Sequence, residues 1–196
     1  MTDTTTICNL ALSKLGETSV VNLIDPTNRN EELCKLWLPI CRKAALETAE
    51  WSFATKRVRS LAIPPKTDVD AHWGFANRHL IPDGCLRLLE VRETPEGTMA
   101  NALDWQTEDD WIVTDADEVY IRYLSDITDG TRYPAAFVKL LAGMLAYELC
   151  LPITENKELY GQLRDEFRLL RSEAVNTDSL QGRTRRLRAT KLTSWR

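Results

Sequence analysis

Apolar residues near the N-terminus recur at the three- and four-residue spacing of an amphipathic helix. Thr4 or Thr6 can cap the first predicted helix, and Gly16 can end it. The second predicted helix starts in the turn at residues 25–28 and continues to Trp51. Each helix carries an apolar stripe that it cannot bury alone, so the pattern predicts helices that pack against other helices.

Between residues 58 and 124 the pattern changes to short alternating stretches bounded by turn residues, which is typical of strands. An extended segment is predicted over residues 58–63. Candidate strands follow at residues 86–93, 104–107, 111–114 and 118–124. The last two flank the short loop 115–117 and predict a β-hairpin. We expect these segments to form one small antiparallel sheet.

Helical spacing returns after residue 132, where Pro134 suits the first turn of a third helix. Its predicted apolar stripe is Phe137, Leu140, Leu141, Met144, Tyr147 and Leu151. Pro152 should stop this helix, and Thr154 can cap a fourth. The stripe of the fourth helix is Leu159, Leu163, Phe167, Leu170 and Ala174. The small residues Ala142, Gly143 and Ala146 should allow close helix packing.

The element order predicts an α+β protein that is mainly α-helical, with a small antiparallel β insert. A four-helix body is expected from both chain ends, residues 1–57 and 133–176, because no helix could bury its stripe alone. Residues 58–132 form the predicted β-rich insert, and residues 177–196 form an extended basic C-terminal arm.

Charge divides the chain into an acidic body and a basic end. The net charge is −4, yet residues 182–196 contain no acid. Residues 1–181 hold 19 basic and 29 acidic residues, which gives the body a charge of −10. The basic end carries Arg183, Arg185, Arg186, Arg188, Lys191 and Arg196. Such an arm has too few apolar residues to fold alone and is typical of a segment that docks onto a partner.

The chemistry of the arm leaves its partner open. Its arginines can pair with phosphates or, in bidentate geometry, with carboxylates of a protein. Leu192 and Trp195 can anchor in a protein groove, and Trp195 can instead stack on a nucleic-acid base. A solvated tail without a partner is the third interpretation.

Acidic residues supply the first candidates for catalysis. They are Asp109, Asp110, Asp115, Asp117 and Glu118. Two carboxylates that converge on a cleft, such as Asp110 and Glu118, could act in a cell-wall hydrolase. However, these acids lie in or beside predicted turns, where aspartate is common for local hydrogen bonding. Catalysis therefore ranks well below a structural role.

The remaining chemistry-bearing residues form no recognisable site. His72 and His79 flank Trp73 and Phe75 without a third ligand nearby, and the scattered cysteines form no C-x-x-C pair. A histidine paired with Cys41 or Cys85 as nucleophile stays open, although nothing local supports it. No glycine-rich phosphate loop occurs. We therefore expect no metal, no cofactor and no enzymatic activity, and we expect the cysteines to be buried free thiols.

The sequence also bears on location. The first residues lack the basic and apolar regions of a signal peptide, so we expect the protein to fold in the cytoplasm where it is made. The longest apolar stretch, residues 135–151, contains Lys139 and Glu148 and is expected to be too short to span a bilayer.

Several segments together resemble one known family. Residues 7–16 read ICNLALSKLG, residues 51–57 read WSFATKR and residues 80–87 read LIPDGCLR. The predicted hairpin at residues 111–123 is followed by YPAAF at residues 133–137. In order and spacing these segments are similar to tail tubular protein A, the head-to-tail adaptor or gatekeeper ring of short-tailed bacteriophages. The similarity extends from residue 5 to roughly residue 175, with one extra residue in the turn before Cys85.

The resemblance implies a structural virion protein that is assembled in the host cytoplasm and located in the tail connector. It implies a homo-oligomeric ring of about twelve copies between a portal protein and a tail nozzle protein. Double-stranded DNA would pass through the lumen without specific binding, and no membrane is involved. By position, the portal-binding residues would be Arg183, Arg185, Arg186, Arg188, Lys191, Leu192, Trp195 and Arg196. The alternative function is a nucleic-acid-binding protein that uses the same arm.

Overall fold

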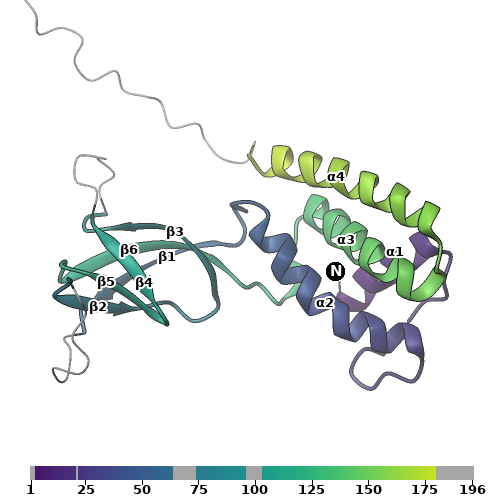
Figure 1. The fold of residues 1–196 in the computed structure, drawn as a ribbon, viewed down its shortest axis with the longest axis horizontal. Coiled ribbons are helices and arrows are strands. Elements are labelled where there is room, and N and C mark those ends of the chain that lie inside the picture. Colours follow the sequence, from purple (N-terminus) through teal and green to yellow (C-terminus); the bar gives the residue numbers. More distant parts are fainter. Residues whose placement is uncertain (1–2, 21, 64–73, 96–102, 180–196) are drawn as a thin grey trace, which may run out of the picture.

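The computed structural model of the chain describes residues 3–20, 22–63, 74–95 and 103–179. These residues form an α+β fold with four α-helices and two small antiparallel sheets, which confirms the predicted class. The helices gather in one body and the strands in another beside it (Figure 1). We call them the helical body and the β unit. The predicted portal-binding residues and His72 lie outside the described residues.

The helical body contains α1 (Thr4–Leu15), α2 (Arg29–Glu47), α3 (Ala135–Thr154) and α4 (Lys157–Ser179). α3 lies at its centre and contacts each of the other three helices. Leu145 and Leu149 are fully buried although they lie off the predicted stripe, while Leu151 within that stripe is 39% exposed. The other five residues of the predicted stripe are buried in the core or packed on it, so the stripe is confirmed except at Leu151. The buried surface is broader than predicted, because a helix with three helical neighbours buries most of its circumference.

Several predicted helix ends also need correction. Asp3, rather than Thr4 or Thr6, caps α1 by accepting a hydrogen bond from the Thr4 amide. Gly16 ends α1 with φ of +74°, as predicted, because glycine adopts this left-handed conformation without a Cβ clash. α2 ends at Glu47 and so stops short of Trp51.

Pro152 lies inside α3, so the predicted stop at this proline was wrong. The helix continues to Thr154 and ends at Glu155, which has φ of +54°. Proline only removes one backbone donor, and the helix tolerates this loss close to its C-terminus. Asn156, rather than Thr154, caps the N-terminus of α4, because its side chain accepts hydrogen bonds from the amides of Glu158 and Leu159.

The β unit consists of two three-stranded antiparallel sheets where the sequence predicted one. The first sheet has the order β1-β6-β3, with β1 (Thr55–Leu61), β6 (Glu118–Ser125) and β3 (Cys85–Arg92). The second has the order β2-β5-β4, with β2 (Asn77–Leu80), β5 (Trp111–Thr114) and β4 (Trp105–Glu108). The predicted hairpin of β5 and β6 was wrong, since β5 pairs with β2 and β4 while β6 pairs with β1 and β3.

Each body has its own apolar core. The large core lies among the helices and extends to Trp51 and Phe137, whose rings meet edge to face with centroids 5.2 Å apart. The small core joins the two sheets and contains Val91, Ile112, Ala116, Val119, Ile121 and Tyr123. Between the bodies, the Ser125 amide donates to the Ala54 carbonyl at 2.9 Å. Asp126 follows β6 and accepts a bidentate pair from Arg42 on α2.

The cysteines are free, as predicted, and Cys8, Cys34, Cys41 and Cys150 are buried. Burial raises the pKa of Cys41 to about 12, and a hydrogen bond with Cys34 together with burial raises the pKa of Cys8. Both thiols are therefore protonated at neutral pH. They act as small apolar groups between α1 and α2 rather than as nucleophiles.

Candidate functional site

The described chain ends where the two bodies meet. Asp178, in the last turn of α4, accepts hydrogen bonds from the amide and hydroxyl of Ser52 at 2.9 and 2.8 Å. Ser52 lies between the end of α2 and the start of β1. α4 reaches Ser179, so helix occupies the first residues of the range 177–196 that the sequence assigned to the arm.

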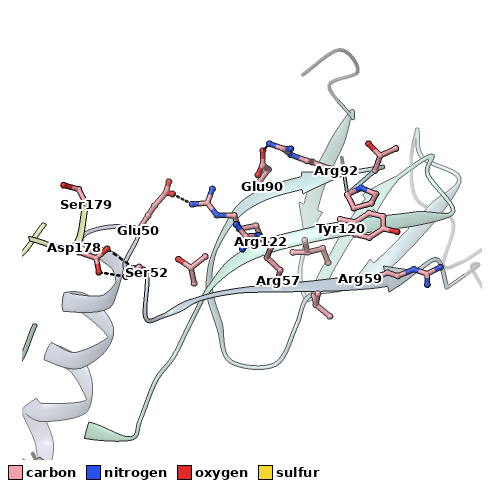
Figure 2. A pocket seen from close by; sticks show the side chains of 15 residues that line it. Glu50, Ser52, Arg57, Arg59, Glu90, Arg92, Tyr120, Arg122, Asp178 and Ser179 are labelled. Atoms are coloured by element: carbon pink, nitrogen blue, oxygen red, sulfur yellow. Dashed lines mark hydrogen bonds and ion pairs between the residues drawn. The ribbon is translucent and has the colours of Figure 1, made fainter. Parts of the chain in front are cut away.

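An open hollow of about 1030 Å³ lies beside the junction. Its floor is the outer face of the β1-β6-β3 sheet, and its wall is formed by the ends of α2 and α4 (Figure 2). The sheet contributes the basic side chains Arg57, Arg59, Arg92 and Arg122. The wall contributes Glu50, Ser52, Asp178 and Ser179. We call this feature the arginine hollow.

Two arginines of the hollow are neutralised by glutamates. The Arg122 Nη2 lies 2.5 Å from the Glu50 Oε2, a contact that also links the sheet to the end of α2. Arg59 pairs with both carboxylate oxygens of Glu118, at 2.5 and 2.6 Å. The Arg59 guanidinium lowers the pKa of Glu118, whose hydrogen bond raises the pKa of Tyr120. Glu118 is therefore held as a carboxylate by its cation.

The other two arginines differ from each other. Arg92 pairs with Glu90 on the same strand, since side chains two residues apart share one face of a sheet. The Arg57 side chain has no ion pair or hydrogen bond with any other residue that the structure describes. In the register of β1 and β6 it lies directly opposite Arg122, and like charges in such a position repel. Arg57 is therefore the one arginine of the hollow without a carboxylate partner in the described residues, while Asp178 on the wall contacts Ser52 rather than a cation.

The arginines were not singled out from the sequence, although a signal was present. Arg57 and Arg59 are two residues apart at the start of the predicted extended segment 58–63, which Arg57 directly precedes, and Tyr120 and Arg122 are two residues apart in a predicted strand, so each pair would share a face. The sequence could not show that β1 and β6 are neighbours. Without that pairing, the basic residues read as an ordinary solvated face.

The acidic candidates are separated by the fold. Asp110 precedes β5 and Glu118 follows the turn after β5, so the two lie beyond opposite ends of that strand. Asp115 accepts a hydrogen bond from the Ala76 amide, and Asp117 accepts one from the Asn77 side chain. The structure thus gives these aspartates the local turn roles that were weighed against catalysis. It does not place Asp110 and Glu118 on one cleft.

His79 is fully buried in the β unit, where its Nε2 lies 3.0 Å from the Ala116 carbonyl oxygen and its Nδ1 has no partner. Cys41 belongs to the core of the helical body, so the structure does not pair it with His79. Within the described ranges, no group of three or more His, Cys, Asp or Glu residues could hold a metal ion.

Among the described helices, α3 is the one that is long and apolar enough to cross a membrane. Its 20 residues exceed the predicted apolar stretch, so the expectation of insufficient length was wrong. However, 56% of the most apolar part of this helix is buried inside the protein, which is the pattern of a core helix.

Comparison with known proteins adds no assignment. No protein-family model matches this chain, and a search of curated proteins gives no match. The resemblance to the adaptor family therefore rests on the segments quoted from the sequence.

Proposed function

We propose that this protein is a structural virion protein that forms a ring and joins a bacteriophage portal to the tail nozzle. The quoted segments support this proposal by their places in the fold. Residues 7–16 cover most of α1 and the glycine that ends it, and residues 51–57 lead into β1. Residues 80–87 form the turn into β3, and residues 133–137 start α3. A shared order of such structural positions is what a family with a common fold requires.

The observation that carries the proposal is an exposed apolar face on the helical body. Leu36 and Ile40 lie one turn apart on α2 and are 59% and 52% exposed, with exposed Pro39 between them. Single exposed apolar residues are ordinary, but a contiguous group on one helix marks a contact surface. We assign this face to the contact between neighbouring copies. In this arrangement the four helices from both chain ends pack copy to copy, and the arm extends to the portal.

Charge supports the assigned DNA passage. Residues 1–181 carry −10, and a lumen lined by this body would repel the phosphates of the duplex. DNA could then slide through the ring without binding to it. We assign the positive charges of residues 183–196 to portal binding, since arginine can form bidentate pairs with carboxylates.

A truncation tests the arm and the ring separately. A chain that ends after Gln181 keeps all of α4, including the Asp178 contact with Ser52, so it should fold like the full chain. It should fail to bind the portal protein of the same phage in co-purification and should leave heads without tails in electron micrographs. Retained portal binding by the folded truncation would refute the role of the arm.

Charge reversal gives a finer version of this test. Arg185→Glu with Arg186→Glu should weaken portal binding most at low salt, where exposed charges attract over the longest distance. The matched control is Arg132→Glu with Lys139→Glu, an equal charge change at two exposed positions of the body. Steep salt-dependent binding to any DNA duplex, without portal binding, would instead support the nucleic-acid-binding alternative.

A further inference from the structure

The arginine hollow and an acidic turn of the same chain are complementary. We propose that the hollow receives the β4–β5 turn, Glu108 to Asp110, of a second copy of this chain. The contact rests on the proposed ring and names one pair of surfaces that would join neighbouring copies. It is separate from the apolar face of α2 and from the arm.

The hollow offers one guanidinium, that of Arg57, which no carboxylate of the described residues contacts. Arg57 and Arg122 face each other across β1 and β6, and only Arg122 has a carboxylate partner, Glu50, in the described structure. Keeping two guanidinium groups side by side costs free energy unless an anion lies between or above them. Arg59 continues the same face, and the guanidinium N–H groups that Glu118 does not use can donate to further carboxylate oxygens.

The turn offers the matching negative charge. Glu108 ends β4, Asp109 and Asp110 lie between β4 and β5, and all three are exposed. None of them makes an ion pair with a residue in the described ranges. Asp109 has φ of +52°, a conformation typical of a tight turn in which aspartate is tolerated. Three successive carboxylates repel one another, so a cationic surface would reduce the electrostatic repulsion at the turn.

One copy cannot bring these two surfaces together. The hollow lies on the outer face of the β1-β6-β3 sheet, whereas the turn belongs to the β2-β5-β4 sheet. The apolar cluster around Ile112, Val119 and Ile121 joins the inner faces of the two sheets. The contact must therefore form between copies. It uses a different surface on each partner, and such a head-to-tail contact is the kind that closes a ring.

By charge, the basic C-terminal segment would suit the hollow less well. Residues 182–196 carry six basic residues and no acid, and they would add positive charge beside Arg57. The turn of a second copy removes charge instead. A three-residue turn buries less than a standard interface of about 1,200–2,000 Å², so this contact alone should be weak and salt-sensitive.

Sedimentation velocity of the full chain over a range of concentrations, at about 20 mM and about 300 mM salt, tests the contact. Wild type should self-associate at the lower salt concentration. Arg57→Glu should weaken association at least tenfold, and so should the double change Glu108→Lys with Asp110→Lys. A mixture of these two variants should associate again, because each hollow then meets a turn of opposite charge.

The matched control is Lys56→Glu, which makes the same charge change one residue away on the opposite face of β1. It should associate like wild type. The contact is overturned if Arg57→Glu behaves like this control, if the mixture stays monomeric, or if wild type does not associate at low salt. None of these results removes portal binding by the arm, which the truncation after Gln181 tests separately.

Discussion

The bidentate pair of Arg42 and Asp126 links α2 to the segment that follows β6, and its loss should destabilise the protein measurably. The Arg42 Nε and Nη2 lie 3.0 and 2.9 Å from the two carboxylate oxygens of Asp126. Both side chains are only 15% exposed. Arg42→Ala removes two charge-assisted hydrogen bonds and leaves a half-buried carboxylate without its cation.

The size of the effect follows from this burial. Breaking a fully buried ion pair costs about 3–5 kcal/mol, and an exposed pair is worth at most about 1 kcal/mol. At 15% exposure some water can replace the guanidinium, so Arg42→Ala should lower the free energy of unfolding by about 2–3 kcal/mol. For a chain of this length that corresponds to a fall in Tm of roughly 5–10 °C.

Urea unfolding followed by tryptophan fluorescence and circular dichroism measures this loss. Arg42→Lys keeps the charge without the planar fork and should lose about half as much. The control is Arg164→Ala, since Arg164 pairs with Asp165 at side-chain exposures of 49% and 63%. Its loss should stay within about 0.5 kcal/mol. If Arg42→Ala costs no more than this control, the reasoning from burial is wrong.

Two further substitutions test the helical body. A Cβ built at Gly143 would lie 2.7 Å from the Leu170 Cδ1, so Gly143→Val should cost about 1–3 kcal/mol in urea unfolding. Gly143→Ala should cost less, because one methyl displaces only the end of a flexible side chain; equal midpoints for wild type and the valine variant would contradict the close approach of α3 and α4. Burial raises the pKa of Glu148, so the folded state binds this proton more tightly than the unfolded state and ionisation opposes folding. Glu148→Gln should therefore stabilise at neutral pH and lose its advantage below the unfolded pKa of about 4.3, and a gain independent of pH would contradict this account.

Local patterns were sufficient where an element has one buried face. α4 follows its predicted stripe, with Leu163 and Ala174 buried and Leu159, Phe167 and Leu170 packed on the core. In α4 the sequence period and the burial pattern coincide. The strand at Trp111–Thr114 was placed correctly for a different reason: turn residues bound a short run, and Ile112, Val113 and Thr114 are all buried.

Long-range pairing could not be predicted in the same way. β5 and β6 are close in sequence, which favours a hairpin, yet β5 lies between β2 and β4. β2 reads Asn-Arg-His-Leu and has too few apolar residues to stand out. Its place as a strand depends on pairing with β5. The arginine hollow depends on the register of β1 with β6, so it could not be predicted either.

Each body buries its own apolar cluster, and both apolar and polar contacts join the two. Between them lie the Arg42–Asp126 pair, the Arg122–Glu50 pair and the Asp178 contact with Ser52. Leu124 of β6 is fully buried in the core of the helical body, and Leu86 of β3 packs against that core, so apolar packing also holds the orientation of the bodies. Arg42→Ala removes the least exposed of these ion pairs. The substitution should therefore change the relative orientation of the two bodies more than it changes the packing of either apolar core.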